Sequence, residues 1–369
     1  MEQLNLFDMI GDEEHKPIKS NDWKWTYKDY PTQNNGIKVF SCFACGGGST
    51  MGYKLAGCDV LGCLEIDPKI NAVYTKNHHP KYNFLMDIRE FNKLDDLPEE
   101  LYNLDILDGS PPCTTFSMAG EREESWGKQK KFREGQTKQT LDDLSFIFIE
   151  TVKKLKPKVV IMENVEGITL GAAWQYVQRI YSDLTAAGYL LTHHLLRGEE
   201  MGIPQTRHRV FFIAIRKDLN IDPKSIDMSF NYLPITYGEI KAGEGTLLNP
   251  KTQAYFYIKN YATPEEKRLA DVFKKIGEKE RRFNYRIAWE ENILQTLTAS
   301  LDYICGRSLR SISIEDIIHA QTFPEDYEFI ENTFQNVAYI CGMSVPPLMI
   351  KRIVNKLINC GVFDYLKEG

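Results

Sequence analysis

The stretch "IKVFSCFACGGGSTMGYKLAG", residues 37–57, decides the fold. Its first seven residues form a short apolar run typical of a buried strand. A cluster of glycines follows, and the last residues have helical spacing. A strand, a glycine-rich turn and a helix in this order bring the backbone close to a bound cofactor. The same layout also serves plain packing of a strand against a helix, so other residues must decide between the two.

Strands and helices alternate up to residue 216. Strand-like apolar segments are separated by segments with helical spacing, and a final strand pair closes the series. The expected strands are 59–65, 83–88, 104–108, 158–164, 189–196 and 209–216, and the expected helices are 68–78, 141–156 and 173–187. This alternation predicts an α/β fold, a doubly wound and mostly parallel sheet with helices on both faces.

The pattern changes at both ends of this region. The first 35 residues are polar and rich in turn formers, which predicts a flexible arm. Residues 218–293 are irregular and rich in tyrosine and charge, which predicts a separate small module. Helical patterns return at 311–321 and 345–360.

The composition excludes several classes of protein. The 369 residues are 43% apolar, but no run approaches the roughly eighteen apolar residues of a membrane span. The N-terminus lacks the pattern of a signal peptide. The eight cysteines show no repeated spacing, which predicts reduced thiols and a cytoplasmic protein. The lone "CFAC" (42–45) has no second ligand pair, so we expect no metal, while a thiol redox pair stays an alternative.

Charge and histidine patterns alone give little evidence for nucleic-acid binding or for a metal site. The net charge is −6, which argues against broad nucleic-acid binding, yet residues 126–140 and 273–286 are locally basic. Such runs also occur on solvated helix faces. The histidine pairs 78–79 and 193–194 cannot easily converge on a metal, because neighbouring side chains in a strand point opposite ways. We therefore interpret them as surface or packing residues.

Acidic residues follow two of the expected strands. Glu65, in "EID", and Asp87 stand at the carboxyl ends of the second and third strands. A carboxylate at this place can hold the hydroxyls of a ribose. Together with the glycine-rich turn, these acids predict a nucleoside-containing cofactor at the carboxyl edge of the sheet.

A thiol, a carboxylic acid and two arginines suggest the chemistry. Cys113 lies in "GSPPCTTFS" (109–117), behind two prolines and before a basic loop, which favours a reactive thiolate. Glu163, in "ENV", ends a neighbouring strand. A thiol nucleophile and an acid suit attack on an electron-poor ring. Arg207 and Arg209, in "QTRHR", would face one side of an extended chain and suit a carbonyl oxygen and a phosphate.

The ordered set "FACGGG", "EID", "GSPPCTTFS", "ENV", "QTRHR" and "GMSVPP" resembles the C5-cytosine-specific DNA methyltransferase family of bacterial or phage type, over about residues 36–360. The resemblance implies the fold of S-adenosylmethionine-dependent methyltransferases with a small target-recognition domain. It implies an enzyme that flips a cytosine out of double-stranded DNA. Cys113 would attack C6, Glu163 would donate to N3, and the methyl group would pass from S-adenosyl-L-methionine to C5, leaving S-adenosyl-L-homocysteine.

The same resemblance assigns the remaining site residues. Arg209 would hold the O2 carbonyl, and Arg207 would brace the catalytic loop or a phosphate. The implied cofactor residues are Phe43, Gly47, Glu65, Ile66, Asp87, Ile88, Pro112, Leu144 and Ser344, and the implied DNA residues are Ser117, Asn164 and Gln205. The implied domains are a flexible arm at 1–35, a catalytic and cofactor-binding domain at 36–217, target recognition at 218–295, and a return to the catalytic domain at 296–369.

Two positions depart from the family pattern. Cys45 stands where the family usually has glycine, and Met343 where it usually has asparagine. Either change could affect cofactor binding without touching the cytosine chemistry. Two alternatives within the fold also stay open, an RNA cytosine-C5 methyltransferase and a catalytically silent DNA-binding protein.

Partners are suggested only in outline. The N-terminal "QLNLF" resembles the short peptide by which bacterial replication proteins bind the sliding clamp, although an amphipathic piece folding back on the domain would look the same. The residues are Gln3, Leu4, Leu6 and Phe7. We expect no membrane contact, action as a monomer, and in some settings a cognate restriction endonuclease.

Overall fold

A computed structural model of the chain describes residues 17–30, 34–112, 144–279, 285–300 and 302–367. Its centre is a seven-stranded sheet with the order β3-β2-β1-β4-β5-β8-β6. The first five strands in this order run parallel, and β8 runs antiparallel to both β5 and β6. The strands are β1 (Lys38–Cys42), β2 (Asp59–Glu65), β3 (Tyr82–Leu85), β4 (Ile106–Gly109), β5 (Val159–Val165), β6 (Tyr189–Arg197) and β8 (His208–Arg216). The predicted doubly wound, mostly parallel α/β sheet is confirmed.

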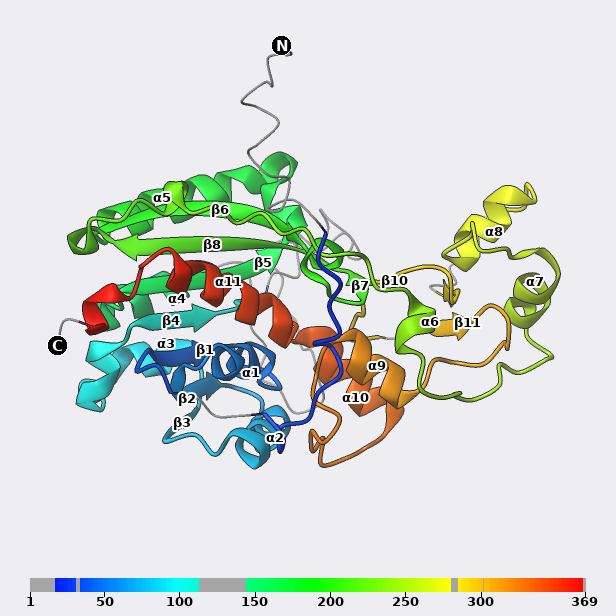
Figure 1. Ribbon diagram of the computed structural model, residues 1–369, viewed down its shortest axis with the longest axis horizontal. Coiled ribbons are helices and arrows are strands. Elements are labelled where there is room, and N and C mark those ends of the chain that lie inside the picture. The colour runs from blue at the N-terminus through cyan, green and yellow to red at the C-terminus, as the bar shows by residue number, and fades with distance from the viewer. Residues whose placement is uncertain (1–16, 31–33, 113–143, 280–284, 301, 368–369) are drawn as a thin grey trace, which may run out of the picture.

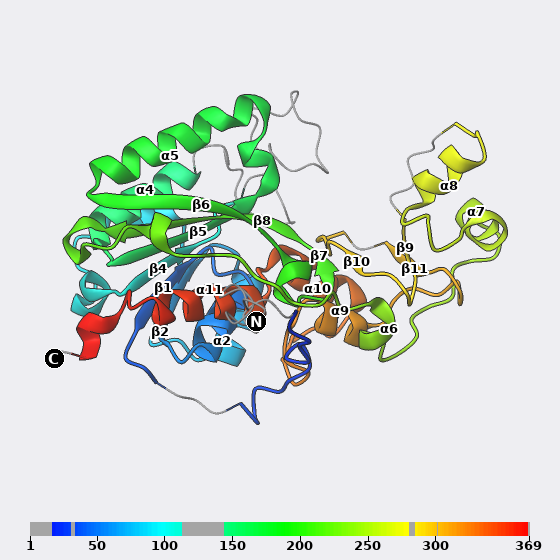
Figure 2. The ribbon, with the colours of Figure 1, turned by 45° about the horizontal axis from the view of Figure 1, so that its top comes forward.

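Helices cover both faces of this sheet (Figures 1 and 2). Successive residues of a strand point to opposite faces, and both faces are buried. Val39 packs in one core with α1, α2 and α11, whereas its neighbour Phe40 packs in a second core with α3, α4 and α5. The helices are α1 (Gly48–Leu55), α2 (Pro68–His78), α3 (Ile88–Lys93), α4 (Leu144–Leu155), α5 (Trp174–Ala186), α9 (Ile314–Ala320), α10 (Phe334–Met343) and α11 (Pro347–Asn359).

A small second domain projects from one end of the molecule (Figures 1 and 2). Its core includes Trp289, Ile304 and Leu309, whereas Ile226 and Met228 belong to the main core. The buried residues of this small core range from Ala254 to Leu309, so they begin within the region expected for target recognition, 218–295, and end beyond it. The elements of this region are β7 (Gln205–Thr206), α6 (Tyr237–Ile240), α7 (Gln253–Tyr261), α8 (Leu269–Lys275), β9 (Arg286–Ala288), β10 (Leu294–Gln295) and β11 (Tyr303–Cys305).

Residues 17–30, here called the strap, pack on the domain that contains the seven-stranded sheet. Trp23 is buried in the main core. Ile18 forms a bridge with Tyr232, and the indole of Trp25 donates to the Thr322 carbonyl at 2.9 Å. The prediction of a flexible arm over 1–35 is therefore wrong for residues 17–30, because burial of these aromatic rings compensates the cost of ordering a polar segment.

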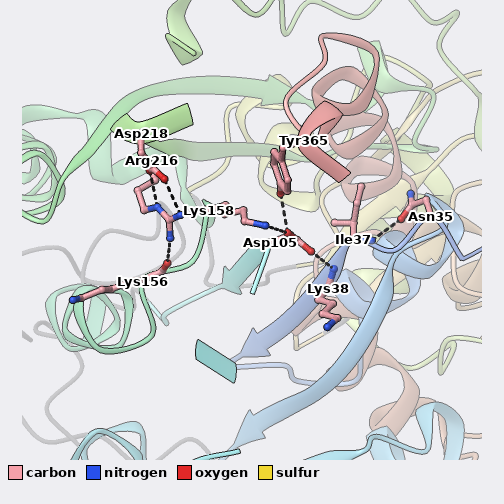
Figure 3. Close-up of polar contacts among 9 residues, drawn as sticks. All are labelled: Asn35, Ile37, Lys38, Asp105, Lys156, Lys158, Arg216, Asp218 and Tyr365. Atoms are coloured by element: carbon pink, nitrogen blue, oxygen red, sulfur yellow. Dashed lines mark hydrogen bonds and ion pairs between the residues drawn. The ribbon is translucent and has the colours of Figure 1, made fainter. Parts of the chain in front are cut away.

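A buried carboxylate ties the amino ends of the central strands together (Figure 3). Asp105 directly precedes β4. It accepts hydrogen bonds from the backbone N–H of Lys38 at 2.7 Å, the Lys158 ammonium at 2.9 Å and the Tyr365 hydroxyl at 2.8 Å. Lys38 starts β1, Lys158 precedes β5, and Tyr365 lies in the last helical turn, Asp364–Lys367. This edge of the sheet is thus closed, and the opposite edge is left for a ligand.

One apolar segment of the described residues is long enough to cross a membrane by length and composition. It covers Phe334–Asn359, and 83% of the tested window is buried inside the protein. The segment contains both α10 and α11. Both helices contribute buried residues to the main core.

Candidate active site

A cavity of about 300 Å³ opens at the carboxyl ends of β1, β2, β4 and β5. The strand order reverses between β1 and β4, and open α/β sheets bind ligands at such a switch point. Predicted site residues from all parts of the chain line this cavity: Phe43, Glu65, Ile66, Asp87, Ile88, Pro112, Leu144, Glu163, Asn164, Arg207 and Arg209. Cys113 and Ser117 lie outside the described residues, as do Gln3, Leu4, Leu6 and Phe7.

Glu65 organises the glycine-rich turn. Its carboxylate accepts hydrogen bonds from the backbone N–H of Cys45 at 2.9 Å, of Ile66 at 2.8 Å and of Asp67 at 2.9 Å. Burial raises the pKa of Glu65, although these three donors oppose the shift. The carboxylate therefore joins the ends of β1 and β2 at the cavity wall.

The next two acids start helices. The Asp87 side chain accepts from the Arg89 N–H at 2.7 Å and so caps α3. Asp67 caps α2 in the same way, before a proline at the first helical position. Only Asp87 was expected at the site, but the "DP" of residues 67–68 is a typical helix start that could have indicated Asp67. Both acids line the cavity.

The glycine-rich turn is held in left-handed backbone conformations. Phe43, Cys45 and Gly47 have φ of 55°, 46° and 78°. A Cβ at Gly47 would lie 2.0 Å from Nε2 of His78, so Gly47 serves close packing and does not line the cavity. Cys45 adopts the conformation that glycine adopts without strain, and its side chain lines the cavity.

The "CFAC" thiols do not suit redox chemistry. Burial raises the pKa of Cys45 to about 12 and that of Cys42 well above its ordinary value. A redox pair needs an accessible thiolate. Because Cys42 is fully buried and burial disfavours both thiolates, the redox alternative has no support.

Glu163 and Arg209 form an ion pair in the cavity wall. Arg209 Nε lies 2.8 Å from Glu163 Oε1, and both side chains are largely buried. The pair follows from the antiparallel register of β5 and β8, in which Val165 stands opposite Arg209. The cavity thus presents a carboxyl group and a guanidinium side by side, as expected for groups that hold a polar ring.

Asn164 carries an unused donor. Its Oδ1 accepts from the Val165 N–H at 2.9 Å, while its Nδ2 is buried without a hydrogen-bond partner. Buried polar atoms are nearly always paired. Because Asn164 lines the cavity, this amide is a natural partner for a ligand.

The side chains of Gln205 and Arg207 have internal hydrogen-bond partners. The Gln205 amide donates to the Ala320 carbonyl at 2.7 Å and accepts from the Leu297 N–H at 2.9 Å. Arg207 donates to the carbonyls of Leu297 at 3.0 Å, Gly342 at 3.2 Å and Ser344 at 2.9 Å. Both side chains are buried. They therefore fix the end of α10 against the segment that returns from the small domain.

The C-terminal motif supplies the last cavity wall. Tyr339, Gly342 and Met343 line the cavity, but the predicted Ser344 does not. The Ser344 hydroxyl donates to the Ile340 carbonyl at 2.8 Å. Tyr339 and Gly342 were not expected individually, and "GMSVPP" was the only indication that this part of the chain reaches the site.

Asp108 is a buried acid close to the cavity that sequence analysis did not single out. It accepts from the Ser41 hydroxyl at 2.6 Å and the Tyr53 hydroxyl at 3.0 Å. Burial raises the pKa of Asp108 to about 7, the neighbouring carboxylate of Glu163 adds to the rise, and the two hydroxyls oppose it. Its position on β4 beneath the site has no indication in the local sequence.

The Asp108→Asn variant should unfold at a higher temperature than the wild type at pH 8, and the difference should be much smaller at pH 5. Folded Asp108 keeps its proton up to about pH 7, whereas an unfolded aspartate loses it near pH 4. Between these values the folded state binds more protons, so stability falls as pH rises through the window. Asparagine cannot titrate and removes this loss. Scanning calorimetry at the two pH values measures the difference.

Asp105→Asn is the matched control. Asp105 is also buried, but its carboxylate faces the Lys158 ammonium, so the amide should lower the unfolding temperature at both pH values. A lower unfolding temperature of Asp108→Asn at pH 8 would contradict the expected effect of burial.

Comparisons with known proteins agree with this geometry. The C-5 cytosine-specific DNA methylase family matches residues 37–359. The chain is 27% identical to the Type II methyltransferase M.Sau96I of Staphylococcus aureus, over 95% of this chain and 84% of that protein. It is also 27% identical to M.HindV of Haemophilus influenzae, over 88% and 97%.

A solved structure shares the fold. The DNMT2 structure from Spodoptera frugiperda superimposes with a TM-score of 0.59 at 16% identity and covers 88% of this chain and all of that one, 100%. At this identity the likeness speaks for the fold alone. Since the family match spans the sheet, the cavity and the small domain, this chain belongs to the C-5 cytosine-specific DNA methylases.

Proposed function

We propose that Cys113, Glu163 and Arg209 carry the reaction of this DNA cytosine-C5 methyltransferase. The cavity supports the proposal most strongly. It places the Glu163–Arg209 pair, Pro112 and the cofactor-type acids Glu65 and Asp87 on the walls of one site. Pro112 directly precedes Cys113. The acid and the cofactor residues thus line one cavity, and the sequence position of Cys113, next to a lining residue, supports its role as the nucleophile.

The cavity fits S-adenosylmethionine. Its volume of about 300 Å³ lies within the usual range for small ligands. Glu65 and Asp87 suit the ribose hydroxyls, and the apolar walls formed by Phe43, Ile66, Ile88 and Leu144 suit the adenine ring. S-adenosylmethionine supplies an electrophilic methyl group when bound. Gly47 and Ser344 would act indirectly, by shaping the turn and the end of α10.

The described side chains suit the cytosine ring. The Cys113 thiolate would add to C6, and the electron pair displaced from the C5–C6 bond would make C5 nucleophilic. Glu163 would give a proton to N3 while Arg209 donates to O2, so both neutralise charge that develops on the ring. After methylation, loss of the C5 proton expels the thiolate and restores the aromatic ring.

DNA enters this scheme through base flipping. A ring inside a duplex cannot reach a cavity at a sheet edge, so the cytosine must leave the stack. We propose that the Asn164 amide helps to receive it, because its Nδ2 has no hydrogen-bond partner among the described residues. The region predicted for target recognition, 218–295, would read the flanking bases, and Ser117 would anchor the loop after Cys113.

Covalent trapping tests the proposed function. A duplex in which the target cytosine carries fluorine at C5 should form a denaturation-resistant adduct when S-adenosylmethionine is present. Fluorine cannot leave as a proton does, so the thiolate cannot be expelled. The adduct should vanish in Cys113→Ala. An adduct with RNA alone would favour the RNA enzyme, and none with either substrate would favour a silent binding protein.

Four further proposals concern a sliding clamp, a restriction endonuclease, the oligomeric state and the location in the cell. We propose that Gln3, Leu4, Leu6 and Phe7 bind a sliding clamp, and a clamp pull-down should be lost when Leu6 and Phe7 are changed to alanine. A cognate restriction endonuclease, action as a monomer and a cytoplasmic location would fit a Type II enzyme. The location is supported by the cysteines of the described residues, all seven of which are free thiols.

A further inference from the structure

The strap is attached to the segment that precedes α10. The Tyr27 N–H donates to Asp326 at 2.7 Å, and the Lys28 N–H donates to the second oxygen of the same carboxylate at 3.1 Å. The Glu325 N–H donates in return to the Trp25 carbonyl at 2.9 Å. In Figure 1 the dark blue strap runs past α9 and α10 towards α2. These bonds hold the strap beside the end of α2, behind the glycine-rich turn.

A relay of side chains leads from the strap to this turn. The Tyr27 hydroxyl lies 3.0 Å from Nδ1 of His78, and Nε2 of His78 lies 3.4 Å from the Tyr327 hydroxyl. Tyr327 in turn donates its proton to the Gly46 carbonyl. Because that proton is used, the Tyr327 oxygen accepts from Nε2–H, and Nδ1 accepts from Tyr27. One direction of donation therefore satisfies every member.

The relay requires a neutral imidazole, and its surroundings provide one. His78 is buried, with its ring centroid 4.5 Å from that of Tyr74. Burial, the Lys54 ammonium and His79 hold the pKa of His78 well below its ordinary value. The Lys54 ammonium donates to the His78 carbonyl at 3.2 Å. The ring thus keeps one donor and one acceptor at neutral pH.

The His78 ring also sets the position of the turn. No side chain fits between this ring and Gly47, so the backbone lies directly against it. Cys45, two residues earlier, lines the cavity, and its N–H is held by Glu65. A displacement of the ring would therefore move the wall that carries the Glu65 carboxylate.

We propose that Tyr27 is a positioning residue for the cofactor cavity, acting through His78 and Tyr327 on the Gly46–Gly47 turn. The proposal rests on the proposed function, in that the cavity binds S-adenosylmethionine. It makes the strap part of the cofactor site although no strap residue lines the cavity within the described part of the chain. The strap would thus set the affinity for the nucleoside, and the cytosine chemistry would not depend on it.

Binding of S-adenosylhomocysteine to the full chain without DNA tests this. In isothermal titration, Tyr27→Phe should weaken binding about five-fold, the equivalent of one lost hydrogen bond of about 1 kcal/mol. In steady-state assays the KM for S-adenosylmethionine should rise by the same factor, while kcat stays within about two-fold. An unchanged dissociation constant would overturn the proposal.

Tyr30→Phe is the matched control. Tyr30 belongs to the strap, and its hydroxyl donates to the Leu55 carbonyl at 2.9 Å. Its backbone N–H donates to the Tyr27 carbonyl at 3.4 Å, but that bond does not involve the hydroxyl that the substitution removes. It should lose a similar amount of thermal stability and bind S-adenosylhomocysteine like the wild type. If both variants weakened binding of S-adenosylhomocysteine equally, the effect would belong to the strap in general, and the relay proposal would be overturned.

The double variant Tyr27→Phe/Tyr327→Phe distinguishes a relay from two separate contacts. Substitutions within one hydrogen-bond network have non-additive effects on binding free energy. The double variant should therefore weaken binding by much less than the product of the two single effects. Full additivity would overturn the relay. If the wild-type protein bound no S-adenosylhomocysteine, the proposed function itself would be contradicted. Failure of the relay proposal and failure of the proposed function are therefore distinguishable.

Discussion

Glu163→Gln is expected to lower the rate of methyl transfer by about 10²–10⁴-fold. The amide keeps the size of the carboxyl group and can still form hydrogen bonds, but it cannot give a proton to N3. It also leaves the Arg209 guanidinium, now 2.8 Å from Glu163, without its counter-charge. Single-turnover transfer of a labelled methyl group to duplex DNA measures the rate.

The same variant should bind S-adenosylhomocysteine within about two-fold of the wild type, because the proposed loss concerns the cytosine ring. Glu166→Gln is the matched control. Glu166 is the first residue after β5 and is partly exposed, with its Oε2 3.6 Å from Nδ1 of His208. It does not line the cavity. A Glu163→Gln enzyme that retains its rate within about three-fold would exclude Glu163 as the acid.

Arg207→Ala should destabilise the fold by roughly 3–5 kcal/mol and lower the unfolding temperature by about 10 °C. The variant removes the donor that Arg207 gives to the buried carbonyls of Leu297, Gly342 and Ser344, although the Ser344 carbonyl still accepts from the Gln321 amide at 2.7 Å. It also opens a cavity where a large side chain stood. Chemical denaturation with urea measures the free energy of unfolding.

Arg197→Ala is the control for this prediction. Arg197 forms an exposed ion pair with Glu200 at 3.1 Å, and such pairs contribute about 1 kcal/mol or less. If Arg207→Ala unfolded like the wild type yet bound DNA poorly, Arg207 would contact the phosphate or the catalytic loop, as its motif suggests.

The strand-end residues of the site could be predicted because their positions follow from the fold. Glu65, Asp87 and Glu163 each stand where a parallel strand ends, and such ends meet at one edge of a sheet. Alternating apolar segments are enough to locate them. The cavity then contains these acids as expected.

The roles of Arg207 and Gln205 could not be predicted, because they depend on distant segments. The chain makes a tight bend here, with the Arg207 N–H donating to the Gln205 carbonyl at 2.9 Å. The partners of both side chains come from residues 297–344. Local spacing predicts two arginines on one side of an extended chain. It cannot show which of the two donates hydrogen bonds to three backbone carbonyls.

The strap was missed for a related reason. Its polar and turn-forming residues outnumber its aromatic residues, so the local composition predicts a flexible arm. Trp23 is nevertheless buried against His319, and Tyr27 is partly buried against His78. Only the fold reveals that these rings have partners about 50 and 300 positions away.

The packing of α11 against α1 has a consequence for the synthesis of the enzyme. A Cβ at Gly52 would lie 2.4 Å from the Pro347 carbonyl, and one at Gly48 would lie 2.1 Å from that of Val345. The glycine-rich turn is therefore completed by residues made some 300 codons later. A nascent chain cannot complete this turn before α11 has left the ribosome, so we expect cofactor binding only after that point. A frameshift before α10 would leave an intact glycine motif and an inert product.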